Sequence, residues 1–124
     1  MHGRTMNSKV VYILEDDPDI SELIAYILSD AGYQVEQFAS VGQFNEFTTH
    51  NLPDIFILDI LLPDGNGLDI CTRLRTDQVT RDIPVLMMSA NKTKRDIEAA
   101  GCGADFISKP FNIDHLLAQV EQYS

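Results

Sequence analysis

The feature that most constrains the fold of this 124-residue chain is a regular alternation of two kinds of segment. Five short runs are rich in β-branched, aromatic and other apolar residues, at positions 10–14, 35–39, 55–58, 85–88 and 106–107. Their nearly continuous apolar character is typical of parallel strands that are covered on both faces. Segments with the spacing of an amphipathic helix follow each run, so the pattern predicts a strand–helix repeat.

The helical segments are recognised by their apolar stripes and their start signals. The clearest stripe places apolar side chains three and four residues apart from Ile20 to Ala31 and ends at Gly32. A second segment starts at Ser40, with Gln43 at the spacing of a capping box. The other three are predicted at about 67–74, at about 93–100, and after the N-cap Asn112 with a staple of Phe111 and Leu116.

Five strands alternating with five helices predict an α/β fold, a doubly wound parallel sheet with right-handed crossovers. No linker, repeat or low-complexity segment divides the chain, so residues 9–124 are predicted to form one domain. Residues 1–8 lack the apolar region of a signal peptide and are interpreted as a disordered leader or a remnant of cloning.

Charge and composition exclude several classes of function. The net charge of −10 disfavours direct binding of nucleic acid and suits cations or a basic partner surface. No apolar run approaches the roughly 20 residues of a membrane span. Cys71 and Cys102 lie far apart in the sequence without the spacing of a metal site, which predicts two reduced thiols in a cytosolic protein.

Polar residues gather where the predicted strands end. Ligands of open α/β sheets bind beyond the carboxyl ends of the strands. The residues at these ends are Glu15 and Asp16 after the first strand, Asp59 after the third, Ser89 after the fourth, and Lys109 after the fifth. The topology therefore predicts acids, a hydroxyl and an ammonium on one rim of the sheet.

This set of residue types suits phosphoryl transfer. Carboxylates that converge need compensation, and a divalent cation or Lys109 can supply it. Oxygen ligands without His or Cys favour a hard ion, Mg²⁺ first with Mn²⁺ as a substitute. Asp59 would be the nucleophile that forms an acyl phosphate, while Lys109 and Ser89 would contact phosphoryl oxygens.

Taken singly, each residue has an ordinary structural explanation. A strand-end acid usually caps a helix, Ser89 would be a turn hydroxyl, and Lys109 a solvated loop charge. Phe106 would be a core residue, and Asn91 the N-cap of the fourth helix. Their placement at successive strand ends of one sheet is what favours the functional interpretation.

Four motifs carry a resemblance to a known family. The segments ILEDDPD, DIFILDILLPDGNGLD, IPVLMMSA and GADFISKPF resemble those of the receiver domains of two-component response regulators, over nearly the whole chain. The resemblance implies a cytoplasmic (βα)5, flavodoxin-like domain with strand order 2-1-3-4-5. It also implies a signalling domain rather than an enzyme, which accepts a phosphoryl group from a sensor histidine kinase or a phosphotransfer histidine domain.

The resemblance assigns roles to individual positions. Asp59 takes the place of the phosphoacceptor and Lys109 that of the lysine that contacts the phosphoryl group. Ser89 and Phe106 take the places of the switch hydroxyl and the switch aromatic. The backbone carbonyl of Leu61 is expected to be a metal ligand, and the Lys109–Pro110 bond is typically cis in the family.

The resemblance implies two roles for the acids that follow the first strand. Asp16 is expected to bind the metal directly and Glu15 through water. Asp17 is expected to be the N-cap of the first helix, with Pro18 at its first position and Asp19 in its first turn. Asn91, two residues after Ser89, is a candidate for positioning the water that hydrolyses the phosphate.

The output of such a domain would pass through the face made by the fourth helix, fifth strand and fifth helix. The partner there is unidentified, and a homodimer formed on phosphorylation is one alternative. The stretch from Ser89 to Lys109 is one or two residues shorter than is common, which leaves the length and orientation of the fourth helix open.

Three alternative functions were weighed against this one. Phosphatases of the haloacid-dehalogenase type also use a strand-end Asp, but Leu61 stands where they need a second acid. The sequence contains neither the glycine pattern of a Rossmann nucleotide site nor that of a P-loop. A pseudo-receiver that acts without phosphorylation would be expected to lack Asp59, Lys109 or one of the acid pair, and this chain has all four.

Overall fold

The apolar runs of the sequence form a five-stranded parallel sheet in the computed structural model, which describes residues 9–48, 51–90, 94–109 and 112–123. The strands of this sheet are β1 (Val10–Leu14), β2 (Gln34–Phe38), β3 (Ile55–Asp59), β6 (Val85–Ser89) and β7 (Asp105–Ser108). Their order is β2-β1-β3-β6-β7. Because β6 and β7 are the fourth and fifth strands of the sheet, this confirms the predicted order 2-1-3-4-5.

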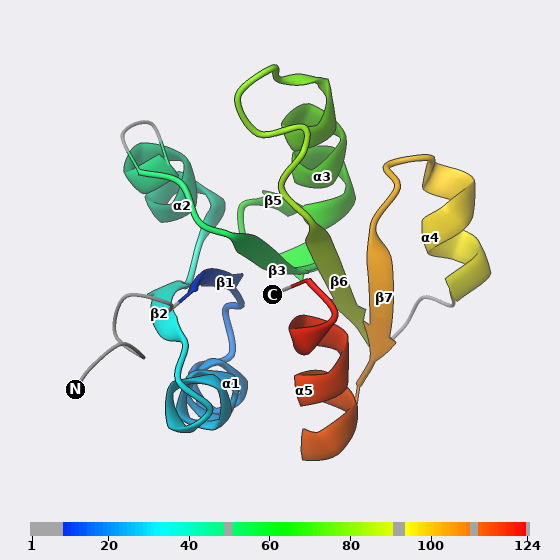
Figure 1. The fold of residues 1–124 in the computed structure, drawn as a ribbon. Helices are drawn as coiled ribbons and strands as arrows, with labels where there is room; N and C mark the ends of the chain where they lie inside the picture. Colours follow the sequence, from blue (N-terminus) through cyan, green and yellow to red (C-terminus); the bar gives the residue numbers. More distant parts are fainter. Residues whose placement is uncertain (1–8, 49–50, 91–93, 110–111, 124) are drawn as a thin grey trace.

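Helices cover both faces of the sheet, as a doubly wound fold requires. They are α1 (Pro18–Asp30), α2 (Val41–Thr48), α3 (Gly67–Thr76), α4 (Lys94–Ala100) and α5 (Ile113–Glu121). Figure 1 shows α1 and α5 on one face, and α2, α3 and α4 on the other.

Two hydrophobic clusters, one on each face, explain why the residues of β1, β3 and β6 are apolar almost without interruption. Alternate side chains of a strand point to opposite faces. Accordingly Leu14 and Leu58 pack on the α2/α3/α4 side, while Ile13 and Ile57 pack on the α1/α5 side. Side chains in the middle of β1 and β3 therefore pack into one cluster or the other. The charged residues of this region lie at or next to the strand ends.

The helix starts follow the predicted capping residues. The Asp17 side chain accepts from the amides of Asp19 and Ile20, and Pro18 begins α1, as expected. Ser40 Oγ accepts a hydrogen bond from Gln43 N at 3.2 Å, as expected for a capping box. Gln43 Oε1 accepts from Ala39 N at 3.1 Å, one residue before the Ser40 amide that a capping box would use. Asn112 accepts from His115 N at 2.6 Å and caps α5.

Three features differ from the expectations or add to them. The segment after Asp59, whose Pro and Gly residues are typical of a loop, forms a two-stranded antiparallel hairpin of β4 (Leu61–Leu62) and β5 (Gly65–Asn66). The second strand starts and ends one residue earlier than predicted. The fold also brings the two distant cysteines together: both are buried free thiols, and the Cys71 thiol donates to the Cys102 carbonyl at 3.7 Å.

The fourth helix, whose length the sequence left open, has seven residues. Ile97 is buried against the α2/α3/α4-side cluster. The predicted disordered leader (residues 1–8), Asn91, the staple residue Phe111 and the Lys109–Pro110 peptide bond lie outside the described residues. Of the helices in the described part of the chain, none is sufficiently long and apolar to cross a membrane.

Candidate functional site

Three acidic side chains converge at the carboxyl edge of the sheet. Glu15 and Asp16 follow β1, and Asp59 ends β3, which pairs directly with β1 through Leu14 and Leu58. Because the strands are parallel, both place their ends on the same edge. Carboxylate oxygens of Glu15, Asp16 and Asp59 all lie within 4.8 Å of one another. The predicted cluster is therefore present.

The three acids differ in burial and in their bonds. Glu15 and Asp59 are buried, whereas Asp16 is exposed. Glu15 Oε2 accepts from Asp17 N at 3.1 Å, and Asp59 Oδ1 accepts from Ile60 N at 2.9 Å. These bonds hold the two buried carboxylates in place and leave Asp16 on the open side of the cluster.

Lys109 supplies the positive charge opposite the acids. Its Nζ lies 2.5 Å from Glu15 Oε1 and 3.2 Å from Asp59 Oδ2. Burial by itself would lower the pKa of Lys109, but the hydrogen bond to Glu15 and the charges of Asp59 and Glu15 outweigh it and raise that pKa. Its backbone amide donates to the Ser89 carbonyl at 2.9 Å, which ties the lysine to the end of β6.

The chemistry of these donors fits a hard divalent cation. Three carboxylates and one ammonium leave two negative charges uncompensated, and one divalent cation would balance them. Mg²⁺ binds oxygen ligands at about 2.0–2.1 Å, so that its ligand atoms are separated by about 3 to 4 Å. The carboxylate oxygens of Glu15, Asp16 and Asp59, all within 4.8 Å of one another, are close to this spacing.

The backbone around Asp59 is held by a close approach of α3. Gly67, the first residue of that helix, donates its amide to the Ile60 carbonyl at 2.8 Å. A Cβ atom at Gly67 would lie 2.0 Å from the Asp59 carbonyl oxygen. Only glycine therefore permits this contact, which fixes the chain where β3 passes into the hairpin.

The two predicted switch residues lie on the strands beyond Asp59. Ser89 ends β6 and is buried, one position beyond Met88, the register partner of Asp59. Phe106 lies in β7 opposite Met87 and packs, half-buried, against the α2/α3/α4-side cluster. Leu61 in β4 has an exposed side chain, which is consistent with a role limited to its backbone.

Asp64 is a residue that the sequence analysis did not single out. It lies in the turn between β4 and β5, and its carboxylate accepts from Val41 N at 2.8 Å and Gly42 N at 3.1 Å. These bonds, the one to Val41 first, lower the pKa of Asp64. An acid after proline in a glycine-rich stretch is an ordinary turn residue, so sequence alone gave no signal of this bond to a helix 22 residues away.

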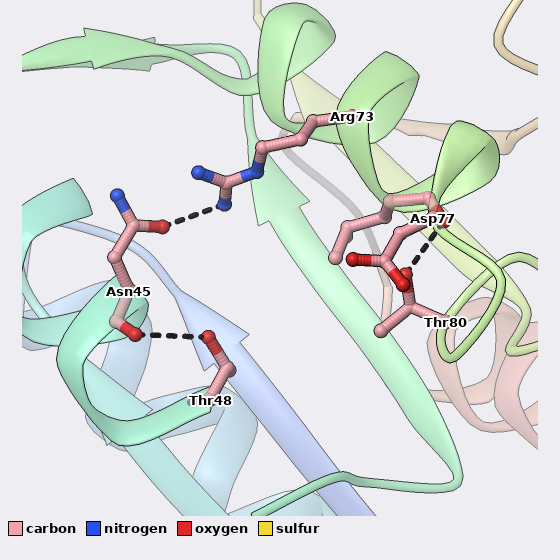
Figure 2. A pocket seen from close by; sticks show the side chains of 6 residues that line it. Asn45, Thr48, Arg73, Asp77 and Thr80 are labelled. Atoms are coloured by element: carbon pink, nitrogen blue, oxygen red, sulfur yellow. Dashed lines mark hydrogen bonds between the residues drawn. The ribbon is translucent and has the colours of Figure 1, made fainter. Parts of the chain in front are cut away.

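Besides a cavity of about 230 Å³ at the start of α2, which Val41, Gly65 and Asn66 help to line, two further cavities among the described residues adjoin this helix. One of about 200 Å³ lies beside the acids and is lined by Glu15, Asp16, Ser21, Gln37 and neighbouring residues. The other, of about 350 Å³, lies between α2 and α3 and contains no residue of the acidic cluster. Figure 2 shows its polar lining, where Arg73 Nη2 donates to Asn45 Oδ1 at 2.6 Å.

Comparison with known proteins decides the family. The model of the response regulator receiver domain matches residues 11–121. The chain belongs to this family. Receiver domains are signalling domains of two-component systems, so the resemblance carried by the four sequence motifs is confirmed.

Individual relatives agree with this assignment. The DNA-binding dual master transcriptional regulator RpaA of Synechocystis is 39% identical over 89% of this chain and 46% of its own length. The phosphate regulon transcriptional regulatory protein PhoB of Pseudomonas aeruginosa is 33% identical over 94% of this chain and 52% of its own length. This receiver domain thus spans about half the length of these two regulators.

Solved structures share the fold along nearly the whole chain. A response regulator from Chloroflexus aurantiacus superposes with a TM-score of 0.86 at 32% identity, covering 94% of this chain and 98% of that one. The receiver domain of a histidine kinase from Syntrophus aciditrophicus gives 0.85 at 31% identity, covering 94% and 89%.

Proposed function

We propose that this receiver domain accepts a phosphoryl group on Asp59 in a reaction that requires Mg²⁺, and that the phosphorylated form changes its output surface. The observation that carries the proposal is the position of Asp59, buried at the sheet edge between Lys109 at 3.2 Å and the acid pair. A carboxylate with an ammonium on one side and a cation site on the other is equipped to attack an anionic phosphoryl donor.

The donor is a phosphohistidine on a sensor histidine kinase or a phosphotransfer histidine domain. A carboxylate oxygen of Asp59 attacks phosphorus, the P–O bond of the acyl phosphate forms, and the P–N bond to the donor imidazole breaks. The departing imidazole nitrogen takes up a proton. The domain thus promotes its own phosphorylation without being an enzyme that turns over a substrate.

The residues around Asp59 provide the electrostatic part of this transfer. Lys109 exchanges its contact with Asp59 for a phosphoryl oxygen, and Ser89 donates a hydrogen bond to another. A bound Mg²⁺ would neutralise the charge that accumulates on the phosphoryl oxygens. Asp16 and Asp59 would hold it directly, with Glu15 acting through water and Leu61 through its backbone carbonyl.

The signal leaves through the face formed by α4, β7 and α5. Movement of Ser89 toward the phosphoryl group vacates space for Phe106, whose side chain is half-buried. Phosphorylation thereby shifts an equilibrium between two states of this face, which binds an unidentified partner or a second copy of the chain. Asn91 tunes the lifetime of the phosphate. The setting proposed for residues 9–124 is the cytoplasm.

The competing proposal is a pseudo-receiver that works without phosphorylation. Incubation with acetyl phosphate and Mg²⁺, followed by mass spectrometry, distinguishes the two. We expect one phosphoryl group on the wild-type protein and on Asp82→Asn, which removes an exposed loop carboxylate, but none on Asp59→Asn. The pseudo-receiver would be favoured if the wild-type protein took up no phosphoryl group from acetyl phosphate or from a phosphohistidine donor protein.

A further inference from the structure

The hairpin that follows Asp59 is tied to the start of α2 by a single side chain. Asp64, in the turn between β4 and β5, directs both carboxylate oxygens at the first two amides of α2, those of Val41 and Gly42. The distances of 2.8 and 3.1 Å are those of charge-assisted hydrogen bonds. An anion at a helix N-terminus also interacts favourably with the helix dipole.

The first three amides of α2 are thus shared between two capping groups. Ser40, next to the helix in sequence, accepts from the third amide, that of Gln43, at 3.2 Å. Asp64, from another part of the chain, accepts from the first two. One cap is local and the other is tertiary, which makes it possible to remove each without the other.

The contact between hairpin and helix is also tight sterically. A Cβ atom added at Gly65 would lie 2.8 Å from Val41 Cγ2, so the tip of the hairpin rests directly on the first residue of α2. One turn after Val41, α2 is joined to α3, since Arg73 donates to Asn45 at 2.6 Å (Figure 2). Helix α2 therefore contacts both the hairpin and α3.

The same hairpin contains Leu61, whose backbone carbonyl is a cation ligand in the proposed function. Leu61 begins β4 and pairs with Asn66, and Leu62 pairs with Gly65, so the turn with Asp64 closes a short ladder that starts two residues after Asp59. A displacement of the turn is transmitted through these pairs to Leu61. A carbonyl that ligates a metal tolerates little displacement, because the ligand distances are narrow.

We propose that Asp64 is a positioning residue for the phosphoacceptor site: by anchoring the hairpin to α2 it sets the place of the Leu61 carbonyl. This inference rests on the proposed function, in which that carbonyl is a ligand of Mg²⁺. It assigns Asp64 no contact with the phosphoryl group or the ion, and its influence is exerted through the hairpin.

The test compares Asp64→Ala with Ser40→Ala, which removes the local cap of the same helix. Mg²⁺ affinity is measured by isothermal titration calorimetry, and amide hydrogen exchange at Val41 and Gly42 reports the cap itself. Loss of groups that orient a metal ligand typically weakens binding by about 10- to 100-fold. We expect about tenfold weaker binding in Asp64→Ala, faster exchange at both amides, and affinity within about twofold of wild type in Ser40→Ala.

Asp64→Asn, which keeps one acceptor oxygen, is expected to bind Mg²⁺ with an intermediate affinity, and it decides the question if Asp64→Ala does not fold. Equal weakening by the two alanine variants would reduce Asp64 to an ordinary stabilising cap and overturn the inference. Unchanged affinity in Asp64→Ala and Asp64→Asn would do the same. Failure of the wild-type protein to bind Mg²⁺ is a different result, because it refutes the proposed function itself.

Discussion

At the scale of residues, the run Glu15, Asp16, Asp17, Asp19 shows how closely spaced acids take different roles. The Asp17 side chain caps α1, and Asp19 lies in the first turn of that helix, both as predicted. Glu15 is buried against Lys109, and Asp16 lies exposed within reach of Asp59. The division between helix start and acidic cluster was predictable because the N-cap position follows from Pro18, which can begin a helix but not continue one.

The division is tested by Asp16→Asn and Asp17→Ser. Asp16→Asn removes the charge of a proposed ligand and should weaken Mg²⁺ binding by more than about tenfold, the lower limit for loss of supporting groups around a metal. Asp17→Ser keeps a good N-cap, and the Asp17 backbone amide that donates to Glu15 is unaffected. We expect its Mg²⁺ affinity, measured by calorimetry, to stay near wild type. Equal losses in the two variants would show the division to be wrong.

Gly67 and Gly42 offer a matched pair of glycine positions. In Gly67→Ala the new Cβ would lie 2.0 Å from the Asp59 carbonyl oxygen, a backbone atom that cannot move without shifting Asp59. We expect a loss of about 1–3 kcal/mol in the free energy of unfolding, measured in urea, and slower phosphorylation by acetyl phosphate.

The control is Gly42→Ala, where the nearest atom, Asp64 Oδ2, would be 3.6 Å away and the contact ordinary. Here the higher helix propensity of alanine should leave stability unchanged or raise it by up to about 1 kcal/mol. A Gly67→Ala protein as stable and as readily phosphorylated as Gly42→Ala would contradict the role given to this close approach.

At the scale of elements, α2 provides a test that depends on pH. The hydrogen bonds from Val41 and Gly42 lower the pKa of Asp64 below its ordinary value of 3.8. A lowered pKa means that the stabilisation is complete above the unfolded value and disappears as pH falls through the folded value. Urea unfolding should therefore show wild type more stable than Asp64→Asn at about pH 7, with the difference shrinking toward about pH 3.

The Ser40→Ala variant serves as the control for this titration. The Ser40 hydroxyl carries no charge in this pH range. The effect of Ser40→Ala on the free energy of unfolding should therefore change little with pH. A difference between wild type and Asp64→Asn that is constant from neutral to acid pH would show that the charge of Asp64 contributes nothing to the cap.

Most elements were predictable because their local signals agree with their surroundings. The apolar runs of β1, β3 and β6 became covered strands, whereas the edge strand β2 is mostly exposed, so the prediction of cover on both faces is wrong for it. The stripe from Ile20 onward became α1 with Ile24, Ile27 and Leu28 buried. The β4–β5 hairpin was missed because each of its strands has two residues and its sequence, rich in Pro and Gly, is typical of a loop. It contacts α2 through the bonds of Asp64 to Val41 and Gly42, which residue spacing along the chain does not indicate.

At the scale of the whole molecule, the fold joins positions that the sequence keeps apart. Cys71 in α3 and Cys102 in the connection from α4 to β7 are 31 residues apart in sequence, yet both are buried in the cluster on the α2/α3/α4 side. Burial and the neighbouring Cys102 thiol raise the pKa of Cys71. Because thiolates are the reactive form, the fold is expected to make this pair unreactive.

This expectation is testable because the chain has no other cysteine. With Ellman's reagent we expect both thiols to react much more slowly in the folded protein than in urea, with the rate rising across the unfolding transition. Single Cys71→Ser and Cys102→Ser variants, checked for folding, assign the remaining signal to each thiol. Rapid reaction of either thiol in native conditions would contradict the protection inferred from burial.

Residue patterns along the chain were enough to predict the order and type of the main elements, the strand ends that carry Glu15, Asp16, Asp59, Ser89 and Lys109, and the cap at Asp17. These follow from local periodicity, from capping chemistry and from the rule that parallel strands share their carboxyl edge. Tertiary structure decided which groups touch: the contacts of Lys109 with both Glu15 and Asp59, the bond of Asp64 to α2, and the meeting of the two thiols. Such contacts depend on how helices and loops pack in space, which residue spacing along one chain does not record.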